Sequence, residues 1–242
     1  MSLVIQSYAR KVYSQNQEDG IIEYLLSRCS NLSHKCIEIG VESGTECNTA
    51  NLIKNHNYTG TLIDKNADFN SEFYNSCRYQ FIKSFVDPSN IVETFEEHDL
   101  RGEYDVLSLD VDGIDYWILK SIIDNNLLTS KVIVLEYQDI IGPELSLTVP
   151  CLPNFNAYDY DHWEGPNYCG ASLQAFIKLL NHHYAFVGCE PLGFNGFWIN
   201  RNQQCHVELE MKDISSCFDH PKVVFGMNHR WPRTNHLEWV VV

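Results

Sequence analysis

The chain has 242 residues, of which 44% are hydrophobic and 20% charged, so it is long enough to bury the core of one α/β domain. Lys and Arg number 17 against 32 Asp and Glu, and the formal net charge of −15 argues against duplex nucleic acid or an anionic membrane surface as a partner. A small-molecule or glycan substrate is therefore expected. No stretch has the apolar length that a membrane span or a secretion signal needs, which favours a cytoplasmic protein.

Apolar runs with helical periodicity alternate with short apolar strands along most of the chain. A first helix is expected over residues 17–28. Strands are expected at 35–39, 61–64, 80–86, 105–110 and 132–137, separated by helices at 47–55, 67–76, 89–98 and 115–126. This order predicts a doubly wound, mostly parallel seven-stranded sheet with helices on both faces, whose ligands lie beyond the carboxyl ends of the strands.

The later part of the chain departs from this alternation. Residues 139–169 are rich in Pro, Asn, Asp and aromatic residues and are too long for a routine connection, so we expect an ordered lid there. A helix over 170–182 then precedes YAFVGCE and GFWINR, which are expected to pair as antiparallel strands and to give the sheet its antiparallel last strand. Residues 201–242 form an extension in which KVVF and LEWVVV are candidate short strands. One domain spanning 1–242 is expected, and a homo-oligomer is compatible with it.

The nine cysteines include no C-x-x-C pair, and several fall inside expected strands and helices. Reduced thiols are therefore expected. A zinc site assembled from distant Cys and His residues stays open as an alternative.

A glycine turn follows the first strand in the stretch CIEIGVESGT, where Gly40 and Gly44 allow the backbone to approach a ligand closely. The dinucleotide fingerprint G-x-G-x-x-G is absent, which disfavours a nicotinamide cofactor, and no phosphate-binding G-x-x-x-x-G-K-[ST] loop is present. Asp64 stands 20 residues after Gly44, at the end of the next strand, where an acid can accept both ribose hydroxyls of an adenosine. A generic α/β turn with a structural glycine is the alternative.

This turn and the order of elements resemble the Rossmann-like class I methyltransferases that use S-adenosylmethionine, over roughly residues 14–200. The resemblance implies that the turn, with Glu38, Gly40 and Gly44, holds the amino acid part of the cofactor. It further implies that Asp64 binds the ribose and that Asp87 meets the adenine amino group.

Two details refine the resemblance. Glu42 stands where many members carry a middle glycine, and its carboxylate could point towards the methionine ammonium. The stretches SQNQEDGIIEYLL, LSLDVDGIDYWILKSI, YCGASLQAFIKLL and GFNGFWINR look like a bacterial branch of the superfamily related to the sugar and natural-product O-methyltransferases.

Acidic residues gather at the ends of the fourth and fifth strands. Asp110, Asp112 and Asp115 lie within six residues, and Glu136 ends the strand VIVLE. If the strand geometry continues, Asp110 and Asp112 point the same way, and with Glu136 they could hold Mg²⁺, which prefers oxygen ligands. Such an ion would lower the pKa of a substrate hydroxyl. The metal-dependent O-methyltransferases carry acidic ligands at these two strand ends, so the resemblance implies the same roles here.

Other interpretations of the acidic cluster stay open. An EF-hand loop is excluded by the position of its glycine. LDVDG also resembles the haloacid dehalogenase phosphatases, with Asp110 as nucleophile, although Ile114 replaces the usual Thr. Glycosyltransferases hold Mn²⁺ with an Asp-x-Asp pair, and a binding protein that kept the fold without chemistry is a further alternative. The simplest alternative is that Asp115 is an acid at the start of a helix and Asp112 a turn residue, so that only Asp110 has a functional role.

A catalytic base is the remaining candidate. Without metal, Asp110 could remove the acceptor proton, and His162 of the aromatic segment has a suitable pKa range for the same task. The sequence therefore predicts an S-adenosylmethionine-dependent O-methyltransferase acting on a hydroxyl of a sugar, glycan precursor or related small molecule, with a phosphatase, a glycosyltransferase or a non-catalytic binding protein as alternatives.

Overall fold

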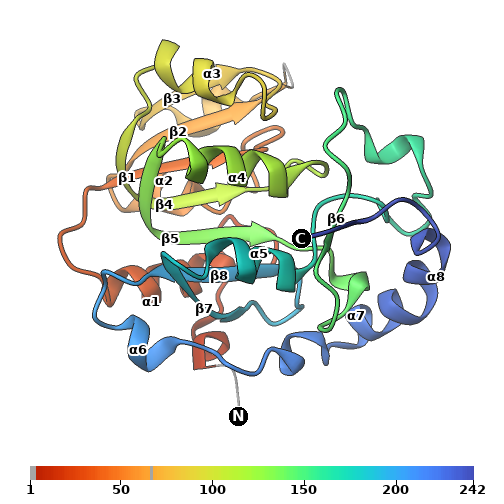
Figure 1. Ribbon diagram of the computed structural model, residues 1–242. Helices are drawn as coiled ribbons and strands as arrows, with labels where there is room; N and C mark the ends of the chain where they lie inside the picture. Colours follow the sequence, from red (N-terminus) through yellow and green to blue (C-terminus); the bar gives the residue numbers. More distant parts are fainter. Residues whose placement is uncertain (1–3, 66–67) are drawn as a thin grey trace.

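Seven strands form one twisted sheet in the order β3-β2-β1-β4-β5-β8-β7. They are seen in a computed structural model that describes residues 4–65 and 68–242 (Figure 1). Strands β1 to β5 run parallel, and β8 runs antiparallel to both of its neighbours. This arrangement confirms the predicted fold class. The strands are β1 Lys35–Ile39, β2 Thr59–Asp64, β3 Arg78–Lys83, β4 Gly102–Leu109, β5 Leu128–Glu136, β7 Tyr184–Cys189 and β8 Asn195–Asn200.

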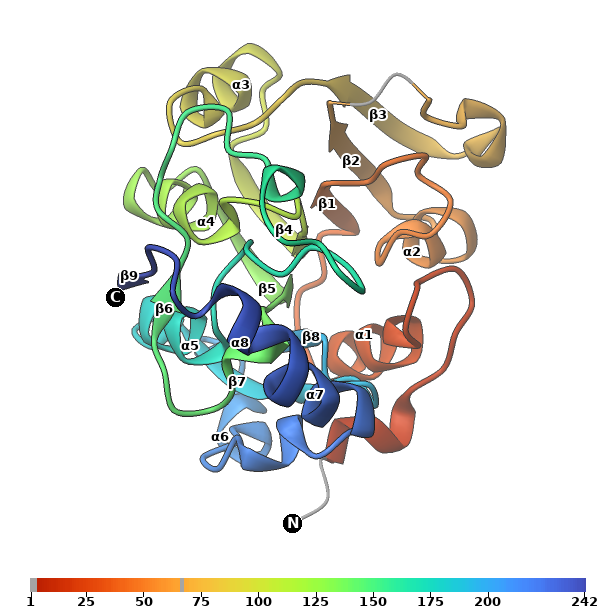
Figure 2. The same cartoon turned by 90° about the vertical axis from the view of Figure 1, so that its right-hand side faces the viewer.

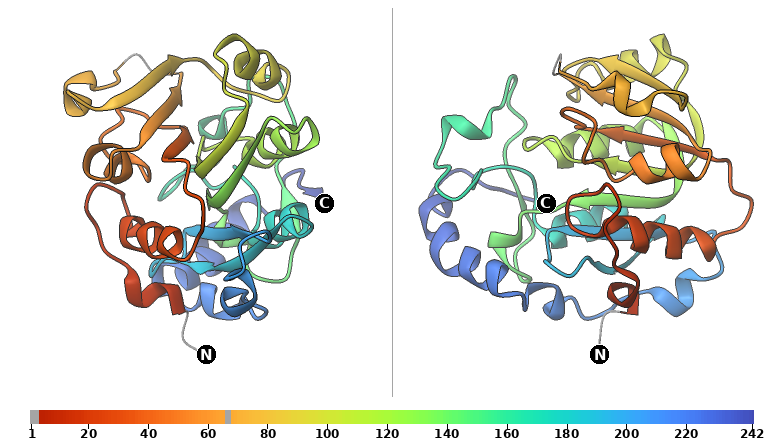
Figure 3. Two further views of the ribbon diagram at one scale, coloured as in Figure 1. Left: turned by 90° about the vertical axis from the view of Figure 1, so that its left-hand side faces the viewer. Right: turned by 180° about the vertical axis from the view of Figure 1, so that it is seen from behind.

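Helices cover both faces of the sheet, because each face buries its own apolar cluster (Figure 3). On one side, α1 and α2 pack against the sheet, and on the other side α3, α4 and α5 do so. The apolar spacing that predicted these helices is the same spacing that buries one side of each of them. Their bounds are α1 Glu18–Ser27, α2 Ala50–Asn55, α3 Ile91–Glu97, α4 Asp115–Asp124 and α5 Leu173–Leu180.

Two local predictions were wrong. The helix expected over 67–76 begins among residues outside the described range, and the described remainder forms only the 3₁₀ turn η2, Ser71–Tyr74. The expected strand KVVF is instead part of helix α7, Pro221–Phe225. Proline at the first helical position is preorganised for a helix, and the His220 ring accepts from the Lys222 N–H, so local capping overrides the apolar β-branched run.

The segment 139–169 is folded rather than extended. It contains the 3₁₀ turns η3, Asp139–Ile141, and η4, Ala157–Asp159, and the short strand β6, Leu147–Thr148. Strand β6 pairs antiparallel with β9, Val240–Val241, so part of the expected LEWVVV strand is present. The Tyr168 ring contacts the Tyr160 ring on one side and the Trp239 ring on the other. The contact with Trp239 attaches this segment to the last residues of the chain.

The C-terminal extension runs from α6, on the opposite side of the molecule, round to the end where β6 lies (Figure 1). It contains α6 His206–Leu209, η5 Ser215–Phe218, α7, the π-helical turn η6 Gly226–Arg230 and α8 Trp231–Thr234. Figure 2 shows α7 and α8 lying beyond the carboxyl ends of the parallel strands. All nine cysteines are free in this structure. Among the described residues, no helix has the length and apolar character needed to cross a bilayer.

Candidate functional site

A cavity of about 450 Å³ opens at the carboxyl ends of β1, β2, β4 and β5, where a doubly wound sheet binds its ligands. Its walls come from the loops that follow these strands and from the segment 139–169. The volume lies in the usual range for a small-molecule site. The residues that bear on its chemistry are Gly40, Glu42, Ser43, Asp64, Asp110, Asp112, Glu136 and Tyr158.

The glycine turn forms one wall, and its first glycine is required by packing. Gly40 has φ +89°, and a Cβ atom there would lie 1.5 Å from the Asp110 carbonyl oxygen. Only glycine therefore lets the chain leave β1 so close to the end of β4. Gly44, with φ +80°, has its Cβ position filled by the ring of Phe69 and does not line the cavity. The sequence predicted both glycines as cofactor residues, but the structure brings only Gly40 to the cavity.

Asp64 ties the turn to the next strand. It is buried at the end of β2 and lines the cavity. Its Oδ2 accepts a hydrogen bond from the Glu42 N–H at 2.7 Å. Glu42 itself has φ +47°, a left-handed conformation that explains why a glycine is common in such a position. The turn and the acid therefore form one continuous surface.

Two other residues predicted to meet the cofactor lie outside this cavity. The buried carboxylate of Glu38 accepts hydrogen bonds from the Thr49 N–H at 2.8 Å and the Thr49 hydroxyl at 2.6 Å, which fixes the start of α2. Asp87 accepts from the Ser89 N–H at 2.7 Å in the turn that leads into α3. Neither lines the cavity.

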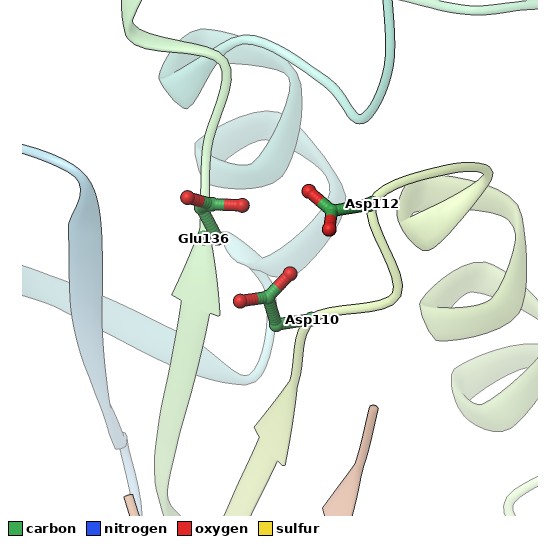
Figure 4. A group of neighbouring side chains, drawn as sticks. All are labelled: Asp110, Asp112 and Glu136. Carbon is green, nitrogen blue, oxygen red and sulfur yellow. The ribbon is translucent and has the colours of Figure 1, made fainter. Parts of the chain in front are cut away.

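Asp110, Asp112 and Glu136 converge at the mouth of the cavity (Figure 4). One ligand oxygen from each of these carboxylates lies within 4.8 Å of the others. The expected strand geometry does not continue to Asp112, because β4 ends at Leu109 and Asp112 has φ +51°. A left-handed turn, and not the pleat of a strand, brings the second carboxylate back towards the first.

The loop between β4 and α4 is held by Asp115, which does not join the cluster. Its Oδ1 accepts from the Val111 N–H at 2.8 Å and its Oδ2 from the Gly113 N–H at 3.0 Å. Asp115 is buried in the first turn of α4, where the helix dipole favours an acid. Its carboxylate therefore fixes the position of Asp112 between the two donors.

The three converging carboxylates cannot all be ionised without cost. Burial, followed by the charge of Asp112, raises the pKa of Asp110 well above its usual value. Burial, followed by the charge of Asp110, raises the pKa of Glu136 in the same way. A divalent cation with oxygen ligands would balance these charges, and the donor set suits Mg²⁺, Mn²⁺ or Ca²⁺. The residues present therefore fit a metal ion.

His162 lies away from the carboxylates. Its ring is exposed, its Nδ1 lies 3.0 Å from the Tyr160 carbonyl oxygen, and it lines neither this cavity nor the adjacent one described below. Tyr158, whose ring contacts that of His162, stands at the cavity instead and is 58% exposed. The structure thus offers an aromatic surface at the site where the sequence had suggested a base.

A second cavity of about 350 Å³ adjoins the first, and the acidic cluster stands between them. Gln15, Asp112 and Glu136 line both cavities. Sequence reasoning missed Gln15, which belongs to the SQNQEDG stretch before α1. The stretch was noted only for its resemblance to a bacterial branch of the methyltransferases, and no role was assigned to Gln15.

The N-terminal loop that carries Gln15 is fixed by two buried acids at the start of α1. Asp19 Oδ2 accepts from the backbone N–H groups of Val12, Tyr13 and Ser14 at 2.7 to 2.9 Å. Glu18 accepts from the Asn16 N–H at 2.6 Å and from the Asn195 side chain at 2.8 Å, which links the loop to β8. These bonds hold the loop against the wall that the cavities share.

The sequence matches no protein-family model and no curated protein. Among solved structures, the fold is similar to a hemolysin candidate from Lactococcus lactis, at 13% identity and a TM-score of 0.47, over 78% of this chain and 89% of the other. It is similar to a precorrin-6y C5,15-methyltransferase from Geobacter metallireducens at 18% identity and a TM-score of 0.34, over 55% and 68% of the two chains. The tRNA N6-threonylcarbamoyladenosine dehydratase of E. coli shares 13% identity at a TM-score of 0.30, over 47% and 60%. At these scores the similarities carry no weight for function, which has to be argued from the site itself.

Proposed function

We propose that the protein is an S-adenosylmethionine-dependent O-methyltransferase that acts on a hydroxyl of a sugar, a glycan precursor or a related small molecule. The observation that carries the proposal is the position of the carboxylate cluster between two adjoining cavities, one of which is bounded by the glycine turn and Asp64. A methyl donor and an acceptor need such a junction, because transfer requires the two reactants to be held in line.

The first cavity is assigned to the cofactor. Asp64 would accept the ribose hydroxyls, since a carboxylate has room for several donors beyond the Glu42 N–H. Gly40 lets the backbone pass close to the methionine part, and the Glu42 carboxylate can meet its ammonium. Phe85 and Val86, beyond β3, supply an apolar surface for the adenine in place of the Asp87 carboxylate predicted from the sequence.

The second cavity is assigned to the acceptor. Its hydroxyl oxygen attacks the methyl carbon, the new C–O bond forms as the C–S bond breaks, and S-adenosylhomocysteine leaves. The hydroxyl proton passes to a carboxylate of the cluster, and Glu136 is suited to receive it because it lines both cavities and burial raises its pKa. This assignment moves the role of base from His162 to the cluster.

Asp110, Asp112 and Glu136 would also be the ligands of a divalent metal ion. Such an ion would supply Lewis acidity, which lowers the pKa of the acceptor hydroxyl. The role of the protein residues is then to orient the acceptor and to keep the three carboxylates together.

Calorimetric titration with S-adenosylhomocysteine, with and without Mg²⁺, tests the proposal. We expect micromolar binding that is weakened about 10- to 100-fold in Asp64→Ala and retained in Asp87→Ala, whose carboxylate lies outside the cavity. Absence of binding under both conditions would refute the methyltransferase assignment. Asp110 and Asp112 would then be tested in phosphoryl transfer or sugar-nucleotide binding.

A further inference from the structure

The second cavity has two chemically different walls. On the sheet side it is lined by Asp112 and Glu136 of the carboxylate cluster, and on the helix side by Lys222 of α7 and Arg230 of η6. The helix wall belongs to the later part of the C-terminal extension, and α7 and α8 lie beyond the carboxyl ends of the strands in Figure 1. The acids Asp115, Asp139 and Glu164 also line this cavity, so the two cations distinguish one wall and do not make the cavity positive as a whole.

Arg230 is held in place by one hydrogen bond, and its other side-chain donors have no hydrogen-bond partner in the described part of the chain. Its side chain is only 16% exposed, and its Nε donates to Asn167 Oδ1 at 2.7 Å. The nearest carboxylate, Asp139, is 3.8 Å from Nη1, which is too long for a hydrogen bond. A guanidinium has five N–H donors, and within residues 4–65 and 68–242 no other hydrogen bond of this side chain is formed.

The unused donors of Arg230 are available to an acceptor from outside the chain. Arg230 lines the cavity, and none of its nitrogens is among the fully buried side-chain atoms without a partner in the described part of the chain. Carboxylate and phosphate groups match the fork of a guanidinium in a bidentate manner. The positioning bond to Asn167 resembles the preorganisation that anion recognition needs.

Lys222 adds to this wall from the first turn of α7. It lines the same cavity, and no acidic partner for its ammonium is found among the residues that the structure describes. By contrast, Arg233, one turn after Arg230, lies outside both cavities and forms a paired bridge with Asp161 at 2.7 Å. Of the two cations that face the cavity, Arg230 thus has only the 3.8 Å contact with Asp139, and Lys222 has no carboxylate partner in the described part of the chain.

Asp139 supports this view of the wall. It is buried under Arg230, and its Oδ2 has no hydrogen-bond partner within the described part of the chain. Burial raises the pKa of Asp139 to about 6, against the opposing effect of the Arg230 charge. At 3.8 Å, Asp139 pairs with Arg230 without a hydrogen bond, so it leaves the donors of the guanidinium unused.

We propose that the second cavity binds an acceptor that carries an acidic group, a carboxylate or a phosphate, at Arg230 and Lys222. The hydroxyl of the same molecule then lies against the carboxylate cluster on the opposite wall. This narrows the acceptor to an acidic sugar or a similarly sized hydroxy acid. The placement of the hydroxyl rests on the proposed methyl transfer, whereas the acid-binding wall does not.

The test compares glucose, glucuronate and glucose 1-phosphate as probes, titrated into the full chain and followed by ligand-observed NMR. We expect at least one acidic sugar to bind about tenfold or more tightly than glucose, as a charge-assisted pair would give. Whether glucuronate or glucose 1-phosphate binds more tightly identifies the acidic group. Equal binding of all three probes would overturn the proposal.

Variants locate the effect. Arg230→Gln should abolish the preference for acidic sugars, and Arg233→Gln is the matched control that should preserve it. A preference that survives in Arg230→Gln would overturn the assignment. If Arg230→Gln does not fold, Lys222→Gln decides, because Lys222 is exposed and its loss leaves the core intact: a weakened preference supports the wall and an unchanged one refutes it.

Titration of the same samples with S-adenosylhomocysteine separates this inference from the proposed function. An acid preference that depends on Arg230 without adenosyl binding would refute the methyltransferase and keep the acid-binding wall. Adenosyl binding without a preference for acidic sugars would support the methyltransferase and refute the acid-binding wall. Retained adenosyl binding in Arg230→Gln also shows that the variant is folded.

Discussion

The Glu42 N–H donates to Asp64 Oδ2 at 2.7 Å, so the acid at the end of β2 holds the turn that follows β1. Substitution of Asp64 therefore removes a cofactor contact and a loop anchor together. We expect Asp64→Ala to weaken S-adenosylhomocysteine binding by about 10- to 100-fold, the loss typical of a hydrogen bond to a charged group. Asp64→Asn keeps an acceptor for the Glu42 N–H, so it should lose less affinity for S-adenosylhomocysteine than Asp64→Ala. Equal affinity in all three proteins, measured by calorimetry, would exclude Asp64 from the binding site.

Glu42 occupies a left-handed position that a glycine would adopt without strain. Its φ of +47° costs a residue with a Cβ roughly 1 kcal/mol or more. Glu42→Gly should therefore raise the unfolding temperature of the free protein slightly, while it weakens adenosyl binding if the carboxylate meets the ammonium. Glu42→Gln separates the two effects, because it removes the charge and keeps the strain. Full affinity in both variants would show that the carboxylate does not contact the cofactor.

Gly40 separates the ends of β1 and β4. In Gly40→Ala the new Cβ would lie 1.5 Å from the Asp110 carbonyl oxygen, so the turn or Asp110 must move. We expect a loss of about 3 kcal/mol in the free energy of unfolding from the clash and the positive φ.

Gly102→Ala is a matched control for Gly40→Ala. Gly102 has φ +133°, but no atom lies within 4 Å of its Cβ position. Gly102→Ala should lose only the part of the free energy of unfolding that comes from the positive φ, without the part from a clash. Denaturant unfolding of Gly40→Ala and Gly102→Ala measures the difference. Equal losses would show that close packing at Gly40 is not what matters.

The carboxylate cluster is expected to lower stability in the absence of metal. Asp112→Asn removes one charge from three converging carboxylates, and Asn tolerates the φ of +51°. The variant should therefore unfold at a higher temperature than the original without metal, by about 2–4 °C for each kcal/mol gained. It should also lose any stabilisation by added Mg²⁺. Thermal unfolding with and without Mg²⁺ measures both effects, and a Mg²⁺ response that persists in the variant would contradict the metal site.

Glu190 makes the stability of the fold depend on pH. Burial raises the pKa of Glu190 to about 7, so between pH 4.5 and about 7 the folded state holds a proton that the unfolded state has released. The free energy of unfolding should therefore fall as the pH rises through this window, by about 3 kcal/mol from this group. Glu190→Gln should flatten the profile, which denaturant unfolding at several pH values would measure. A profile as steep as that of the original protein would assign the effect to other groups.

Much of the fold followed from local pattern, because buried parallel strands are apolar runs between amphipathic helices. The Lys35–Ile39 strand has the predicted bounds, and the carboxyl ends of the parallel strands bring Asp64, Asp110 and Glu136 to one edge. The role of Glu38 was missed because a carboxylate that caps α2 and one that faces a ligand have the same sequence environment. Gly44 was assigned to the cofactor for the same reason: a glycine that makes room for the Phe69 ring cannot be told from one that faces a ligand by its sequence environment.

The helix wall of the second cavity could not be predicted. Lys222 and Arg230 reach the strand ends only after the C-terminal extension has wrapped round the molecule, and no periodicity encodes such a long-range contact. His162 had the right chemistry for a base, but its position depends on how the segment 139–169 folds on itself. Function at this edge therefore depends on contacts that composition and spacing do not reveal.

The pairing of Leu147 with Val241 has a consequence for the order of folding. Contacts between segments so far apart in sequence carry a large loop-closure cost and form late, whereas the neighbouring parallel strands are joined by short crossovers. The sheet, with the glycine turn and Asp64, is thus expected to assemble before the wall that contains Arg230. A refolding protein would then regain adenosyl binding before it regains recognition of an acidic acceptor.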